Sequence, residues 1–173
     1  LHRALLRQNL QRADRLASTS MAMAKQVRRI WPEAGPIHIT PFGVDTERFC
    51  PGAAATQRGL TIGTVKSLAP KYGVDTLIHA FARLMQARAD ADARLLIVGG
   101  GPQRAELESL VAGLHLSRRV EFVGAVSHSE VPRWLREMDI YVAASRDDSE
   151  SFGVAVIEAG TIDSTSSERA MVL

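Results

Sequence analysis

The sequence predicts an α/β fold in which a parallel sheet carries helices on both faces. Two observations lead to this expectation. From residue 60 onward, short apolar runs alternate about four times with amphipathic helical stretches, and that order favours parallel strands joined by crossover helices. The run Leu95-Leu96-Ile97-Val98 is continuously apolar, which is typical of a strand buried on both faces. We therefore expect a doubly wound, Rossmann-like sheet.

Composition and charge exclude several classes of protein. The 173 residues are 46% hydrophobic and 23% charged, which is typical of a globular chain. A formal net charge of +2 is too balanced to indicate nucleic-acid binding. The sequence has no apolar run of about 18 residues that would predict a membrane-spanning helix. A membrane surface is a possible partner that the sequence does not indicate, and we expect a cytoplasmic protein. Cys50 is the only cysteine, which excludes an intrachain disulfide.

The first 42 residues are predicted to form a small piece of their own, followed by a linker. Ser20 can cap a helix that Pro32 ends. The elements predicted in this piece are helices at 1–12 and 20–31 and strands at 15–19 and 37–40. Glycine, proline and small residues gather between residues 43 and 58, which is typical of a linker between two lobes.

The alternating pattern occupies residues 59–160. The predicted strands span residues 60–65, 95–98, 120–123 and 140–143. The predicted helices begin at Asp75 as a cap, after Pro102, near Pro132 and at Gly153. Residues 161–173 show neither helical nor strand periodicity, so we expect an unstructured tail there.

Two lysines lie in the loop after the first of these strands. In doubly wound sheets ligands bind outside the carboxyl ends of the strands. Lys66 and Lys71 follow the strand at 60–65 and precede the next helix. Two ammonium groups beside a helix N-terminus suit a diphosphate, whereas the alternative is a pair of solvated surface lysines.

The strand at 95–98 ends in a glycine cluster, Gly99-Gly100-Gly101-Pro102. The cluster does not match the dinucleotide fingerprint, because the third glycine of that pattern would fall at Arg104. The sequence leaves two interpretations open: close approach of the backbone to a ligand, or a tight turn into the next helix.

Acidic residues cluster before the last predicted helix. Asp147, Asp148 and Glu150 precede it, and Glu158 follows Glu150 by eight residues. Carboxylates accept hydrogen bonds from sugar hydroxyls, and free backbone N–H groups near Gly153 suit a phosphate. The alternatives are a helix cap for Glu150 and an exposed helix position for Glu158. A metal site is disfavoured, because the alternating spacing of a calcium loop is missing and the five histidines form no metal spacing.

Five blocks in this order resemble family 4 glycosyltransferases, which are retaining enzymes of the GT-B type with two facing Rossmann-like lobes. Glu150 and Glu158 match the E-x7-E signature of that family. The blocks are Pro41–Phe49, Thr61–Ile78, Leu96–Pro102, Val120–Gly124 and Ser145–Ala159. The resemblance implies that residues 59–160 are the donor-binding lobe, and that residues 1–42 hold the last strand and helix of the acceptor lobe.

The resemblance also implies roles for individual residues. Lys66, where the family usually has Arg, and Lys71 would hold the donor's diphosphate and stabilise the departing charge, with Glu150 on the sugar hydroxyls as the third catalytic residue. Glu158 would bind the ribose. The remaining donor-binding positions implied are Gly99, Gly101, Pro102, Val123, Gly124, Ser151, Phe152, Gly153 and Val154.

For substrates, the resemblance implies a UDP- or GDP-linked sugar, no metal cofactor, and an acceptor glycan, lipid or small metabolite bound by the other lobe. Most of that lobe has no counterpart in the 173 residues, so we expect a fragment that is inactive alone. The sheet would also end at the strand containing Ile140, which leaves an open edge that could pair two copies of the chain.

Two further hypotheses compete with a donor-binding lobe. A degenerate lobe could act as a non-catalytic interaction module through the open edge. A different two-lobed sugar-phosphate enzyme, such as a non-hydrolysing epimerase, shares the architecture, but the spacing of Glu150 and Glu158 favours a transferase.

Overall fold

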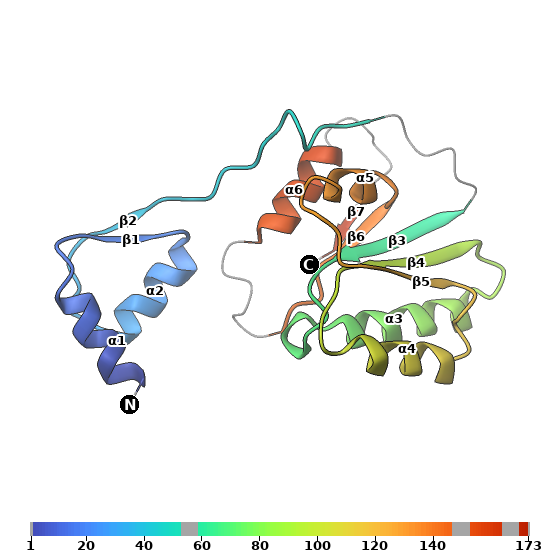
Figure 1. Ribbon diagram of the computed structural model, residues 1–173, viewed down its shortest axis with the longest axis horizontal. Coiled ribbons are helices and arrows are strands. Elements are labelled where there is room, and N and C mark those ends of the chain that lie inside the picture. Colours follow the sequence, from blue (N-terminus) through green and yellow to red (C-terminus); the bar gives the residue numbers. More distant parts are fainter. Residues whose placement is uncertain (1, 53–58, 147–152, 164–169, 173) are drawn as a thin grey trace. The chain divides into compact units, whose positions relative to one another are not determined.

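The computed structural model describes residues 2–52, 59–146, 153–163 and 170–172. The chain divides into two compact units, residues 1–43 together with 150–153, and residues 44–149 together with 154–173. Each unit has a sheet of its own, and Figure 1 labels the helices and strands of both.

The first unit is a small α/β piece. Its elements are α1 (His2–Gln11), β1 (Leu16–Ser18), α2 (Met21–Ile30) and β2 (Ile37–Ile39). β1 and β2 pair in parallel. The Ser20 hydroxyl accepts a hydrogen bond from the backbone N–H of Met23 at 3.1 Å, so this predicted helix cap is observed.

The second unit is built on five parallel strands in the order β5-β4-β3-β6-β7. They are β3 (Leu60–Val65), β4 (Ala93–Val98), β5 (Val120–Gly124), β6 (Ile140–Val142) and β7 (Ala170–Val172). From β3 the chain winds first to β4 and β5, and then to β6 and β7 on the other side. The carboxyl ends of β3 and β6 therefore form the topological switch point, where such sheets bind ligands.

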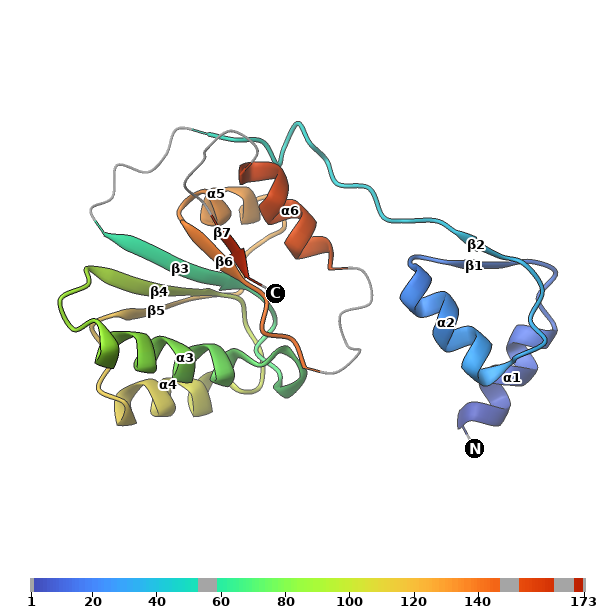
Figure 2. The same cartoon turned by 180° about the vertical axis from the view of Figure 1, so that it is seen from behind.

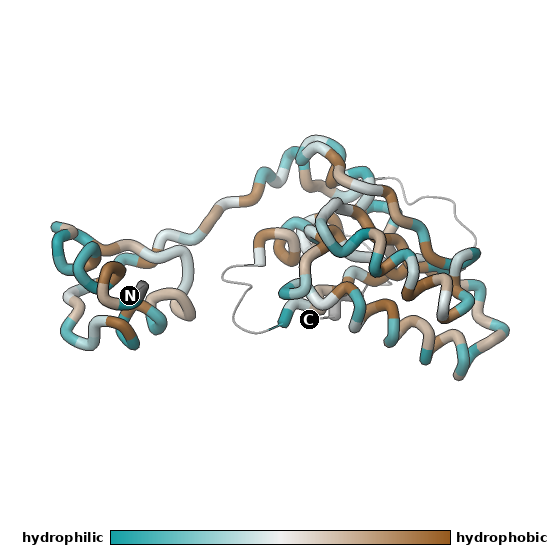
Figure 3. Tube along the Cα trace, turned by 60° about the horizontal axis from the view of Figure 1, so that its bottom comes forward, coloured by the Kyte–Doolittle hydropathy of each residue, from teal (hydrophilic) through white to brown (hydrophobic). Residues whose placement is uncertain are grey.

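Helices cover both faces of this sheet. α3 (Val74–Ala87) and α4 (Arg104–Gly113) lie on one face, and α5 (Val131–Arg136) and α6 (Val154–Asp163) lie on the other (Figures 1 and 2). The buried residues of α3 recur at helical spacing, namely Val74, Leu77, Ile78, Phe81, Ala82 and Met85, and Figure 3 colours the trace by hydropathy. This spacing gives α3 one apolar side to bury.

The central strand β4 is buried on both faces, as its sequence predicts. Leu95 and Ile97 belong to the core beneath α3 and α4, whereas Leu96 and Val98 belong to the core beneath α5 and α6. All four side chains are 0% exposed. The parallel, doubly wound α/β prediction is therefore confirmed.

Three local features differ from expectation. α3 is capped by Gly73, whose φ of +62° lets the short 3-10 helix Pro70–Tyr72 lead directly into it, and Asp75 lies in its first turn. α6 continues to Asp163, and β7 pairs with β6. The predicted unstructured tail is therefore wrong at these residues, and so is the predicted open edge beside Ile140. A three-residue strand is too short to show periodicity in the sequence.

The third difference concerns the predicted linker. The Asp45 carboxylate accepts hydrogen bonds from the backbone N–H groups of Glu47 and Arg48, both at 3.1 Å. This turn delivers Phe49, which is 1% exposed, into the core beneath α5 and α6. The guanidinium of Arg136 then donates to the Cys50 carbonyl at 3.1 Å. The first part of the 43–58 segment is thus anchored in the second unit.

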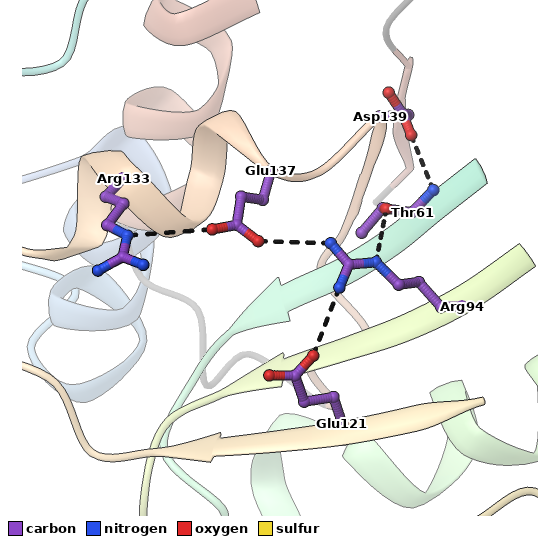
Figure 4. Close-up of polar contacts among 6 residues, drawn as sticks. All are labelled: Thr61, Arg94, Glu121, Arg133, Glu137 and Asp139. Atoms are coloured by element: carbon purple, nitrogen blue, oxygen red, sulfur yellow. Dashed lines mark hydrogen bonds and ion pairs between the residues drawn. The ribbon is translucent and has the colours of Figure 1, made fainter. Parts of the chain in front are cut away.

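A charged network ties the amino ends of the strands together (Figure 4). Arg94 on β4 donates to the Thr61 hydroxyl at 3.0 Å, and it pairs with Glu121 and Glu137 at 3.4 and 3.3 Å. The Asp139 carboxylate accepts from the backbone N–H of Thr61 at 2.7 Å. The network fastens three strands and the turn after α5 at the sheet edge opposite the switch point.

Candidate functional site

Lys66 and Lys71 converge on one aromatic ring at the carboxyl end of β3. Their Nζ atoms lie 5.5 and 4.8 Å from the centroid of the Tyr72 ring. The face of an aromatic ring attracts cations, so Tyr72 helps hold two positive charges near each other. Such a pair suits a ligand with adjacent negative charges, such as a diphosphate.

The glycine turn packs against this lysine loop. Gly99 has a φ of +141°, and a Cβ there would overlap the Lys66 carbonyl oxygen. A Cβ at Gly101 would likewise overlap the Leu68 carbonyl oxygen, and the Leu68 N–H donates to the Gly100 carbonyl at 2.9 Å. Of the two interpretations left open by the sequence, the packing turn is therefore observed at both glycines. Gly101 and Pro102 also stay exposed, so they remain accessible to a ligand.

The end of β5 joins the same loop cluster. Gly124 is buried with a φ of +95°, and its carbonyl accepts from the backbone N–H of Gly99 at 2.8 Å. Val123 packs at the margin of the core beneath α5 and α6. The structure thus gathers the predicted positions on the loops after β3, β4 and β5 at one edge of the sheet.

Arg146 fastens the segment after β6 to the lysine loop. Its backbone N–H donates to the Lys71 carbonyl at 2.8 Å, and its guanidinium binds the Asp75 carboxylate at 2.5 Å and the Thr76 hydroxyl at 2.8 Å. The same two segments meet at Gly73, where a Cβ would overlap the Ala144 carbonyl oxygen. Sequence reasoning did not identify Arg146, because its partners lie about 70 positions away and leave no local pattern.

Glu158 is buried and paired with a histidine. The carboxylate sits on α6, its side chain is 8% exposed, and its Oε1 lies 2.8 Å from Nε2 of His128. The alternative of an ordinary exposed helix position is therefore wrong. Gly153, with a φ of +73°, directly precedes the first residue of α6, Val154. Sequence reasoning assigned His128 no role, and its contact with Glu158 spans 30 positions.

Several predicted positions lie outside the described residues. These are Asp147, Asp148, Glu150, Ser151 and Phe152. Among the residues that the structure does describe, no three His, Cys, Asp or Glu side chains gather as metal ligands would. In the same part of the chain, no helix combines the length and the apolar character needed to cross a bilayer.

The site contains groups that can bind phosphates and a group that can bind hydroxyls. The loop after β3 supplies two ammonium groups, and α6 supplies a buried carboxylate. Ammonium groups bind phosphates, whereas a carboxylate accepts hydrogen bonds from hydroxyl groups. A ligand that carries both phosphates and a sugar fits this combination.

Comparisons with known proteins point to one family. Residues 51–163 match the family model described as glycosyl transferases group 1. The chain is 33% identical over 154 residues to a D-inositol 3-phosphate glycosyltransferase of Pseudarthrobacter chlorophenolicus, covering 83% of this chain and 36% of that protein. It is 32% identical over 142 residues to a GDP-mannose-dependent alpha-(1-6)-phosphatidylinositol monomannoside mannosyltransferase of Mycolicibacterium smegmatis. That match covers 74% of this chain and 36% of that protein. The chain thus spans about a third of the length of these curated relatives.

Solved structures share the fold. Sucrose-phosphate synthase from Thermosynechococcus elongatus superposes with a TM-score of 0.81 at 26% identity, covering 98% of this chain and 43% of that one. The Anabaena protein Alr3699/HepE, crystallised with UDP and glucose, gives a TM-score of 0.79 at 19% identity. The match covers 94% of this chain and 47% of that one. The family model covers more than half of the 173 residues. The chain therefore belongs to the glycosyl transferases group 1 family and has the α/β fold of GT-B glycosyltransferases.

Proposed function

We propose that this chain supplies the donor-binding share of a glycosyl transfer that retains the configuration of the sugar. The donor is a UDP- or GDP-linked sugar, and the acceptor is a glycan, a lipid or a small metabolite. Because the chain spans about a third of its curated relatives' length, we assign it donor binding and not turnover by itself. The approach of Lys66 and Lys71 to the Tyr72 ring is the observation that carries the proposal.

The lysine pair has a chemical task in this scheme. When the bond between the sugar and the nucleotide breaks, negative charge develops on the departing diphosphate. Ammonium groups already in place stabilise that charge without reorganising. Two lysines can supply this charge from the protein itself, so we propose that the reaction needs no metal ion. Lysine in place of arginine at position 66 keeps the charge but lacks the planar fork that fixes phosphate geometry.

The other predicted residues complete the donor site in this proposal. Glu158 accepts hydrogen bonds from the ribose hydroxyls, and Glu150 accepts them from the transferred sugar. Backbone N–H groups of Phe152, Gly153 and Val154 bind phosphate, with Ser151 bordering them. The backbone at Val123 and Gly124 borders the base, and Gly99, Gly101 and Pro102 line the phosphate side. We further propose that the chain acts in the cytoplasm. Its single cysteine, Cys50, cannot form an intrachain disulfide, which suits a reducing compartment.

Binding of nucleotides to lysine variants tests the proposal. GDP is the first ligand to try, because the mycobacterial relative is named for GDP-mannose, and UDP is the second. We expect Lys66→Ala and Lys71→Ala each to weaken nucleoside diphosphate binding about tenfold or more, since each removes a charge-assisted contact. Isothermal titration calorimetry measures the dissociation constants.

Two controls separate this effect from general damage. The nucleoside alone, guanosine or uridine, has no phosphate and should bind the lysine variants as it binds the original chain. Lys25→Ala removes an exposed lysine of α2 in the first unit and should leave diphosphate binding unchanged. Equal diphosphate affinities in the original chain and both site variants would contradict the assignment.

A further inference from the structure

The side chain of Glu158 is held by one specific partner. The imidazole Nε2 of His128 lies 2.8 Å from Glu158 Oε1, and the carboxylate is 8% exposed. In the neutral Nε2–H tautomer or as an imidazolium, the ring donates this hydrogen bond. Among the described residues, no hydrogen bond reaches the other carboxylate oxygen, Oε2. One oxygen is thus fixed by the protein, and the other keeps its accepting capacity.

The histidine is itself held in place from two sides. Its ring packs against that of Phe49, with centroids 5.3 Å apart and an interplanar angle of 47°. Phe49 is a core residue with 1% exposure, so it gives the imidazole a fixed backing. The His128 side chain, 63% of which is exposed, therefore contacts a buried aromatic ring and the carboxylate that it binds.

The loop that carries His128 is closed by its neighbours. The Glu130 carboxylate accepts hydrogen bonds from the Ser127 backbone N–H at 3.0 Å and from the Ser127 hydroxyl at 2.7 Å. The hydroxyl groups of Ser127 and Ser129 lie 2.8 Å apart. These bonds span the residues on both sides of His128, so the backbone that presents the ring is fixed as well.

We infer that His128 is a positioning residue for the donor's ribose. It acts through Glu158, whose rotamer it fixes so that the remaining lone pairs meet the vicinal hydroxyl groups of a nucleoside. A carboxylate held in one orientation binds hydroxyls better than one that must be ordered on binding. The inference rests on the proposed function, since it names how that same site recognises the ribose.

The test measures a ratio of affinities. Isothermal titration compares GDP and UDP with their 2′,3′-dideoxy analogues, which lack both hydroxyl groups. We expect the original chain to prefer the ribose form, and His128→Leu to reduce that preference about tenfold. His128→Gln should keep most of it, because the glutamine amide can donate to Glu158 from a similar position.

A matched control and a second variant separate positioning from folding. His79→Leu makes the same change at an exposed residue of α3 and should leave the ratio unaltered. Glu158→Gln should lower the ratio by itself, and adding His128→Leu to it should lower the ratio little further, because the two residues act as one unit. A general loss of stability would weaken the binding of the ribose and the dideoxy nucleotides alike. It would therefore leave the ratio of their affinities unchanged.

The outcomes distinguish this inference from the proposed function. If the original chain binds neither nucleoside diphosphate, the proposed function fails and the inference fails with it. If the chain prefers the ribose form and His128→Leu keeps that preference intact, the inference alone is overturned. A lower ratio in His128→Leu together with rescue by glutamine supports it.

Discussion

At the scale of single residues, Gly99 joins two tightly packed loops. Its φ of +141° is unfavourable for any residue with a Cβ, and a Cβ there would overlap the Lys66 carbonyl oxygen. We predict that Gly99→Ala lowers the free energy of unfolding by about 1–3 kcal/mol from backbone strain alone. Thermal or urea denaturation measures this loss.

Gly113 provides the matched control for this substitution. It lies in α4, and a Cβ there would meet no atom within 4 Å. Gly113→Ala should therefore stabilise the chain by roughly 0.5–1 kcal/mol, through helix propensity and a less flexible unfolded state. Equal effects of the two substitutions would contradict the packing role of Gly99.

Glu130 gives a prediction that depends on pH. The hydrogen bond from the Ser127 hydroxyl, followed by that from the Ser127 backbone N–H, holds the pKa of Glu130 below its ordinary value. A carboxyl group with a lowered pKa contributes stability above its unfolded pKa, and that contribution is lost as the pH falls through the folded pKa. We predict that Ser127→Ala raises the pKa of Glu130 toward its ordinary value.

An NMR titration of the Glu130 carboxyl carbon measures this change. Ser117→Ala removes an exposed serine elsewhere and should leave the midpoint of the titration where it is in the original chain. An unchanged midpoint in Ser127→Ala would show that the hydroxyl contact does not act on Glu130.

At the scale of elements, Arg94 links β4 to three neighbouring segments. It binds the Thr61 hydroxyl, which belongs to a residue that is 1% exposed, and the Glu137 carboxylate, which is 21% exposed. Arg94→Met keeps an unbranched apolar stem but removes the guanidinium, so the Thr61 hydroxyl loses this donor and Glu137 loses one of its partners. We predict a loss of about 1–3 kcal/mol in the free energy of unfolding, from urea denaturation.

An exposed arginine supplies the comparison. Arg88 pairs with Asp90 at 3.9 Å, and their side chains are 70% and 87% exposed. Arg88→Met should change stability by less than about 0.5 kcal/mol, because exposed ion pairs contribute little. Losses of similar size in both variants would contradict a special role for the Arg94 network.

The sequence predicts those elements whose pattern is local. β3 is observed at the predicted residues, and four consecutive apolar residues with no polar face predict residues 95–98 of β4. By contrast, β7 follows a polar stretch and spans only three residues. Its pairing with β6 depends on the tertiary fold, which a periodicity argument does not contain.

The candidate site divides in the same way. The sequence predicts the lysine loop, because Lys66 and Lys71 lie directly after a strand. In the structure both lysines approach the ring of Tyr72. The pairing of His128 with Glu158 and the tether from Arg146 to Asp75 join residues 30 and 71 positions apart. Such contacts depend on how the loops meet, so no local pattern predicts them.

At the scale of the whole molecule, the central claim is that the second unit binds a nucleotide at the carboxyl edge of its sheet. The loops after β3, β4 and β5 are joined there by backbone hydrogen bonds, and α6 adds Glu158. A ligand that binds only the folded state stabilises it by RT ln(1 + L/Kd), where L is the free ligand concentration, so the gain rises with the logarithm of that concentration above the dissociation constant. Stability in the presence of nucleotides therefore reports on this claim directly.

The most direct measurement is a thermal melt of the chain, alone and with UDP, GDP or ADP and the corresponding nucleotide sugars. Ligand at about 100 times its dissociation constant adds roughly 2.7 kcal/mol, which for a chain of this size raises the midpoint by about 5–10 °C. We predict one cooperative transition that UDP or GDP raises by this amount. A midpoint that responds to none of the nucleotides would contradict the claim that this chain binds the donor.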